Sequence, residues 1–282
     1  MEMTAIRGAV FGIAAGAALV TTAPAQAAGH GEEIAALSAA LNLEEMVGIM
    51  HAEGIAYGTQ IGSDMFPDRA GARWVGMVAD IYDPERIYEG VIAGMAEALD
   101  ATEAQAISAF FTTEPGASVA ALELSARRAM LDDEVDAMAR EIAALAAADE
   151  TERFGQIEAF IAANDLIETN VVGALNSNYA FYVGLLNGGA FPQGMSEEQI
   201  LQDVWAQEPD IRDSTEEWLY SFLMLAYQPL SDGELDTYIA FSETDAGVAL
   251  NRALFSAFDP VFEEISLRLG FAAAQMLQSA DL

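Results

Sequence analysis

The chain has 282 residues, with 45 acidic residues against 11 basic ones, all of them arginine, and a formal net charge of −34 at pH 7. Such a charge repels phosphate backbones and anionic lipid surfaces, so we expect no nucleic-acid partner. The chain has no cysteine, which excludes disulfides, and its stability must come from burial of apolar surface.

The first 27 residues have the order of regions of a secretory signal peptide. Arg7 gives a short positive start, an apolar run extends from Gly8 to Val20, and Ala25 and Ala27 form an A-x-A cleavage site. The run is shorter than the roughly 20 residues that cross a bilayer, so we expect no stable membrane span. We therefore expect cleavage after Ala27 and a location in the periplasm.

The remainder is expected to be all-α. Glycine and proline cluster in short breaks, and apolar residues recur at helical spacing. Four pairs have the N-cap and N3 spacing of a capping box: Asp100–Glu103, Ser196–Gln199, Ser214–Glu217 and Ser231–Glu234. Five arginines follow an acid by four residues and are expected on solvated helix faces: Glu123–Arg127, Asp136–Arg140, Asp149–Arg153, Glu208–Arg212 and Glu264–Arg268.

Residues 46–51 contain the best candidate for metal chemistry. His30 is expected to lie in a mobile tail, which leaves His51 as the sole plausible catalytic or ligating imidazole. Met46 and Met50 share a helix face beside it, and thioethers with an imidazole could hold copper(I). Methionine more often fills gaps in a core, so we predict no metal site and no cofactor.

Glycines form flat strips on two expected helices. Gly54, Gly58 and Gly62 recur every four residues, and Gly90 and Gly94 form a second strip. Glycine weakens a helix interior, so we expect these glycines to allow another helix to pack closely. That helix would belong to the first half of the chain or, as the alternative, to a second copy of the chain. We favour the first, and because the second half has Ser177, Phe181 and Leu185 at the matching positions, we expect the two halves to pack differently there.

A helix corner occurs twice, as FFTTEPG at 110–116 and as FSETDAG at 241–247. Each begins with an aromatic at the end of one helix and ends with a small residue that lets two helices approach. A Thr is expected to cap the next helix, with an acid in its first turn. The corner residues are Phe110, Thr113, Glu114, Gly116, Phe241, Thr244, Asp245 and Gly247.

The corner separation of 241 − 110 = 131 residues extends into a longer match, in which Trp74 falls on Trp205. Farther upstream the separation shortens to 166 − 43 = 123, and we place the insertion in the glycine-rich loop at 188–194. We therefore expect two tandem helical repeat units of antiparallel helices with tight αα-corners, at 28–148 and 149–282.

The pattern around each corner resembles the bacterial exported helical domain of unknown function 2059. Glu103, Ile107 and residues 113–116 carry it first, and Glu234, Tyr238 and residues 244–247 carry it again. The first copy departs from the family's Thr-Pro-x-Gly order, and the second lacks the proline. The resemblance implies an exported helical domain and supplies no activity.

The chain has no G-x-S-x-G, H-E-x-x-H, EF-hand or P-loop pattern. We expect a binding, scaffold or chaperone-like module of the cell envelope, whose partner is a protein or a small apolar ligand; a homo-oligomer is possible. A groove between the units would be lined by aromatics, with these candidates: Trp74, Trp205, Trp218, Tyr179 and Tyr182. The alternatives are a carboxylate-based or His51-centred metal-dependent hydrolase, which would need two convergent carboxylates or a metal, and a purely structural envelope protein.

Overall fold

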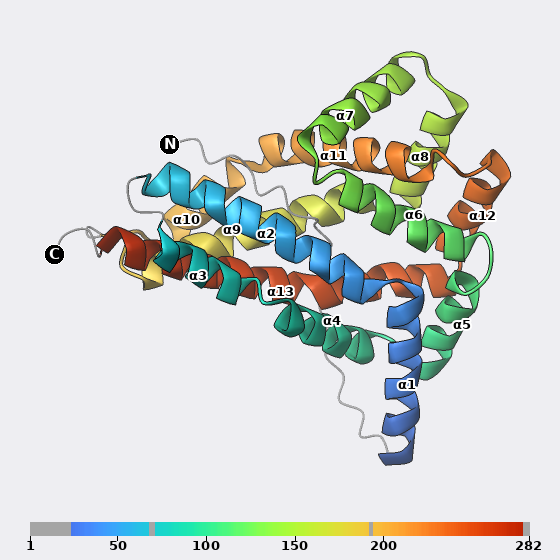
Figure 1. Cartoon of the computed structure of the whole chain (residues 1–282), viewed down its shortest axis with the longest axis horizontal. Coiled ribbons are helices and arrows are strands. Elements are labelled where there is room, and N and C mark those ends of the chain that lie inside the picture. The colour runs from blue at the N-terminus through green and yellow to red at the C-terminus, as the bar shows by residue number, and fades with distance from the viewer. Residues whose placement is uncertain (1–23, 68–70, 192–193, 279–282) are drawn as a thin grey trace.

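A computed structural model describes residues 24–67, 71–191 and 194–278, which form thirteen α-helices and no strand (Figure 1). In chain order they are α1 (Pro24–Ala40), α2 (Leu43–Met65), α3 (Ala72–Ile81), α4 (Pro84–Ala98), α5 (Ala101–Phe111), α6 (Gly116–Ala129), α7 (Asp133–Ala148), α8 (Glu152–Ala163), α9 (Leu166–Asn187), α10 (Glu197–Trp205), α11 (Glu208–Tyr227), α12 (Asp232–Ser242) and α13 (Asp245–Gln278). The prediction of an all-α fold is confirmed. No helix in the described ranges combines the length and apolarity that crossing a membrane requires.

The expected signal peptide falls mainly on residues 1–23, which lie outside the described residues. Helix α1 begins at Pro24, ahead of the expected cleavage site. His30 follows in α1, where its Nε2 lies 2.8 Å from the carbonyl oxygen of Ala96 in α4. The expectation of a mobile tail at His30 is wrong, because α1 packs against α4 and α5.

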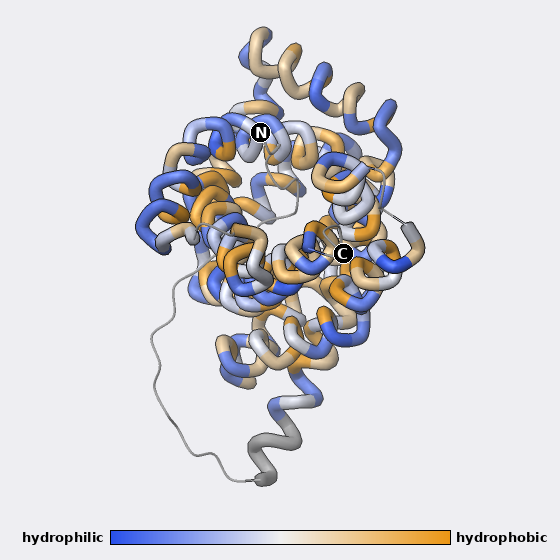
Figure 2. Tube along the Cα trace, turned by 90° about the vertical axis from the view of Figure 1, so that its left-hand side faces the viewer, coloured by the Kyte–Doolittle hydropathy of each residue, from blue (hydrophilic) through white to orange (hydrophobic). Residues whose placement is uncertain are grey.

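Helix α13 organises the core. It is the longest helix, it packs against α9 and α4 over most of its length, and Figure 1 shows it along the long axis of the molecule. Apolar residues gather on the inward faces of the helices, and hydrophilic ones lie outside (Figure 2). The main buried cluster draws side chains from both expected units, and a smaller one joins α9, α10 and the start of α11. The two halves therefore share one core.

The helix order in residues 24–129 corresponds to that in residues 152–278. Asn42 and Asp165, both left-handed with φ of 54° and 49°, precede α2 and α9. Capping boxes at Asp100 and Ser231 open α5 and α12. The separation is 165 − 42 = 123 at the first pair and 231 − 100 = 131 at the second, and α11 has 20 residues against 15 in α4.

The extra residues therefore enter mainly in α11, after Trp205, and the matching of Trp74 with Trp205 is wrong. Trp74 is the third residue of α3, whereas Trp205 is the last residue of α10. The two tryptophans lie at opposite ends of corresponding helices.

Three of the four predicted capping boxes are present, at Asp100, Ser196 and Ser231. The fourth is wrong, because Ser214 lies inside α11 and its hydroxyl donates to the carbonyl oxygen of Ile211. A polar side chain in a helix interior bonds back to the preceding turn when no free N–H is within reach.

The two corners differ at their caps. Thr244 Oγ1 accepts a hydrogen bond from the N–H of Gly247 at 3.1 Å, and Asp245 is the first residue of α13, as predicted. Thr113 does not cap α6, because the loop between α5 and α6 is two residues longer than the one between α12 and α13. Its hydroxyl donates instead to the carbonyl oxygen of Ala109, and Pro115 occupies the N-cap position. Glu114 therefore precedes α6, and the prediction that it lies in the first turn of that helix is wrong.

The corner glycines allow the two helices of each corner to approach closely, as predicted, and the corner phenylalanines also contact each other. A Cβ at Gly116 or Gly247 would collide with the carbonyl oxygen of the corner phenylalanine before it. The rings of Phe110 and Phe241 stack with centroids 3.9 Å apart and planes inclined by 7°. The two corners therefore pack directly against each other, which the sequence did not indicate.

The glycine strip of α2 packs within the first half, as predicted, whereas Gly90 and Gly94 of α4 pack against α13 of the second half, so the prediction is wrong for the second strip. A Cβ at Gly54 or Gly58 would collide with the side chain of Tyr82 or Val78. In the second half the arrangement is reversed: Phe181 of α9 is buried, and the glycine, Gly270, lies opposite it in α13. The halves pack differently, as expected.

Candidate ligand-binding cavity

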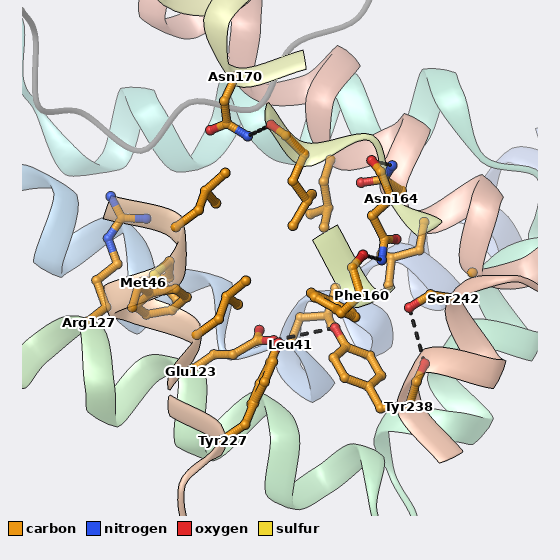
Figure 3. A pocket seen from close by; sticks show the side chains of 18 of the residues that line it. Leu41, Met46, Glu123, Arg127, Phe160, Asn164, Asn170, Tyr227, Tyr238 and Ser242 are labelled. Carbon is orange, nitrogen blue, oxygen red and sulfur yellow. Dashed lines mark hydrogen bonds between the residues drawn. The ribbon is translucent and has the colours of Figure 1, made fainter. Parts of the chain in front are cut away.

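A cavity of about 140 Å³ lies between helices of the two halves (Figure 3). Helices α2 and α6 of the first half form one wall, and α8, α9, α11, α12 and α13 form the rest. Leucine, methionine and phenylalanine side chains dominate the lining, with Met46 and Met50 on one side and Phe160 and Phe222 among the aromatics. A mainly apolar cavity with a few polar groups is typical of a small-molecule site.

The carboxyl group of Glu123 lies against the cavity between two tyrosines. Tyr227 donates a hydrogen bond to Glu123 Oε1 at 2.5 Å, and Tyr238 donates to the same oxygen at 3.4 Å. Burial raises the pKa of Glu123 to about 7, and the two tyrosine hydrogen bonds oppose that rise. Burial also raises the pKa of both tyrosines, and the neighbouring carboxylate raises it further, so both stay protonated.

Arg127 lies one turn after Glu123 on α6, yet the predicted solvated pair between them is wrong. Arg127 is only 5% exposed. Its Nε and Nη2 donate to the two carboxylate oxygens of Glu53 in α2, at 3.0 and 2.7 Å. The guanidinium also lies 6.0 Å from the ring centroid of Trp218. Glu53 thus neutralises Arg127, and Glu123 keeps an uncompensated charge when ionised.

Of the other four predicted arginine pairs, three form and one does not. Pairs with the acid four residues earlier form at Arg140, Arg212 and Arg268. The Asp149–Arg153 pair is wrong: Arg153 donates to the carbonyl oxygens of Tyr227 and Leu230 and to Asp232. Arg153 thereby fixes the end of the helix that carries Tyr227.

Three asparagines line the cavity, and each donates one of its two amide N–H groups to a backbone carbonyl. Asn164 donates to Phe160 O at 2.9 Å, Asn170 to Leu166 O at 2.6 Å, and Asn251 to Asn164 O at 2.8 Å. A carbonyl requires a donor, so these bonds also fix the orientation of each amide. No hydrogen bond to the three Oδ1 atoms arises within the described part of the chain.

Of the five aromatics expected in a groove, Trp218 lines the cavity. Trp74 belongs to the core instead: it is 1% exposed, and its Nε1 donates to Gly58 O at 2.7 Å. Trp205 is 64% exposed at the end of α10. Tyr179 and Tyr182 are partly buried against the smaller cluster.

The candidate copper ligands do not converge. Met46 and Met50 line the cavity, whereas His51 turns toward the α3–α4 junction, where its Nδ1 lies 2.7 Å from Tyr82 O. Within the described ranges, no three histidine or acidic side chains gather closely enough to hold a metal. His51 is therefore outside the cavity.

The sequence interpretation missed Glu123, Tyr227 and Tyr238. A signal was present: Glu123 and Arg127 follow Val119 at intervals of four residues, on the apolar face of their helix. Charged residues on such a face are either paired or functional. The spacing was instead interpreted as a surface ion pair.

The chain matches no protein-family model, no curated protein and no solved structure. The resemblance of its corners to the domain of unknown function 2059 therefore stays a prediction.

Glu123→Gln should change how stability depends on pH. In the wild type, the pKa of about 7 lies above the ordinary 4.5, so the folded state binds the proton more tightly than the unfolded state. Stability from this group is fully present below pH 4.5 and is lost as the pH rises through 7. We expect the variant to gain about 1–2 kcal/mol on the wild type between pH 4.5 and 8.

Urea unfolding of both proteins at pH 5 and pH 8 measures this gain. Glu141→Gln, at an exposed position of α7, removes an equal charge and should show no comparable gain. An equal stability difference at both pH values would contradict the burial of the Glu123 carboxyl group.

Proposed function

We propose that this chain is an exported binding protein of the cell envelope whose cavity holds one small, mainly apolar ligand. The observation that carries the proposal is the cavity itself, lined by apolar and aromatic side chains of both halves. An apolar cavity of about 150 Å³ suffices to bind benzene, so a ligand built on a single ring matches the size here. The expected signal peptide supports the periplasmic location.

A hydrolytic role has less support. Glycoside hydrolysis uses two carboxylates that face the same bond. Among the described residues that line the cavity, Glu123 is the one carboxylate. We therefore propose binding rather than catalysis.

We also propose that the chain consists of two tandem copies of one helical unit. The matching helix order, the paired left-handed junctions at Asn42 and Asp165 and the two corners support this. The cavity would then be formed where two related units meet, and each unit would supply only part of it.

Titration with 2-phenylethanol, a neutral one-ring probe, tests the binding proposal by calorimetry. We expect saturable binding at one site per chain. Leu254→Trp, which places a larger side chain at the cavity wall, should abolish it, because an occupied cavity excludes the ring. Val248→Trp, at a 54% exposed position of the same helix, is the matched control and should bind as the wild type does. Equal binding by both variants would place the probe elsewhere.

A further inference from the structure

Several acceptor atoms of the cavity lining receive no hydrogen bond from the described residues. Glu123 Oε2 receives no hydrogen bond from the described residues, because both tyrosine hydroxyls donate to Oε1. The Oδ1 atoms of Asn164, Asn170 and Asn251 are equally free of described donors. A ligand group placed against Glu123 Oε2 must therefore be a hydrogen-bond donor, because an ionised carboxylate only accepts and an acceptor left without a partner costs stability.

The hydroxyl donors of the lining near Glu123 are already engaged, and each asparagine uses one of its two amide N–H groups on a backbone carbonyl. The hydroxyls of Tyr227 and Tyr238 are spent on Glu123, and the hydroxyl of Ser242 donates to Tyr238 O at 3.1 Å. Arg127 Nη1 has no hydrogen-bond partner among the described residues, while Nε and Nη2 donate to Glu53, which also neutralises the charge. A ligand carboxylate would have to compete with Glu53 for Arg127 and would also meet the charge of Glu123.

The charge and the surrounding rings favour an organic cation. Arg127 and Glu53 cancel, so an ionised Glu123 leaves the lining with one net negative charge. The tyrosines Tyr227 and Tyr238 contact Glu123, and Phe160 and Phe241 line the same cavity. Aromatic faces and a carboxylate together are the usual surroundings of a bound ammonium group.

From these contacts we infer that the ligand is a small hydrophobic amine, with its ammonium group on Glu123 Oε2 and its apolar body among the rings. The inference rests on the proposed function and specifies its ligand class. The three asparagine oxygens would accept the remaining N–H groups of the ligand or of a bridging water. Glu123 thus selects the ligand, while the apolar lining holds it.

Calorimetry at pH 8 with three probes of one shape tests the inference: 2-phenylethylamine, 2-phenylethanol and 3-phenylpropionate. We expect the amine to bind about tenfold more tightly than the alcohol, and the carboxylate to bind weakest. Glu123→Gln, which keeps the shape of the side chain, should lower the affinity for the amine about tenfold and leave that for the alcohol within about twofold. A thermal melt of the variant confirms that it is folded.

The controls separate the possible outcomes. The whole chain is acidic and attracts any cation, so Glu141→Gln on α7 must keep the preference for the amine. An amine preference that survives in Glu123→Gln would overturn the inference, because it would come from the overall charge. Equal affinity for amine and alcohol would overturn it too, and would leave the binding proposal intact. If none of the probes binds, both proposals fail.

Discussion

Arg127→Met should lower the free energy of unfolding by about 3 kcal/mol. The substitution leaves the Glu53 carboxylate, whose side chain is only 26% exposed, without its two charged hydrogen bonds. Removing one partner of a buried ion pair is costly because the remaining charge stays poorly solvated. The expected loss is at the low end of the roughly 3–5 kcal/mol that such substitutions cost, because Glu53 can turn partly toward water.

Urea unfolding measures the loss, and the neighbouring arginine provides the control. Arg128 is exposed on the same helix, so Arg128→Met should change stability by less than about 0.5 kcal/mol. In the double variant with Glu53→Met, neither charge of this pair remains, and its loss should be smaller than the sum of the two single losses. Equal effects at Arg127 and Arg128 would contradict the buried pair.

Gly270→Ala should destabilise the fold by about 3 kcal/mol, although alanine favours a helix. A Cβ at Gly270 would collide with the carbonyl oxygen of Phe181, and one at Gly184 would collide with that of Leu267. The obstacle is backbone on both sides, in the most extensive helix pair of the molecule, α9 with α13. The helices would have to separate, which would loosen the wall of the cavity.

Gly48→Ala is the matched control. Gly48 lies inside α2, and a Cβ there would meet no heavy atom within 4 Å. The same substitution should therefore stabilise the protein by about 0.5–1 kcal/mol. Thermal unfolding of the two variants should shift in opposite directions. A gain at Gly270 would show that α9 and α13 do not approach as closely as described.

The sequence was informative where structure depends on neighbouring residues. Helical periodicity, the caps at Asp100 and Ser231 and the Thr244 corner follow from local hydrogen bonding, and all are present. Thr113 shows the limit of this reasoning, because a loop longer by two residues moves the helix start beyond its reach.

The sequence alone does not predict which side chains pair across long separations. Glu123 and Arg127 have the spacing of a surface ion pair. Arg127 instead donates to Glu53, 74 residues away in the sequence. Glu123 accepts a hydrogen bond from Tyr227, 104 residues away. Only the packing of α6 against α2 and α11 decides which partner each charge meets. Similarly, no local feature distinguishes buried Trp74 from exposed Trp205.

The central claim is that the space between the two halves holds a ligand, and methionine methyl resonances test it most directly. Met46 and Met50 line the cavity, whereas Met138 is exposed on α7 and Met95 is buried in α4 away from the cavity lining. Labelled methyl groups titrated with 2-phenylethanol should shift at Met46 and Met50 and remain unchanged at Met138 and Met95. Saturation of the probe with no change at Met46 and Met50 would contradict the claim.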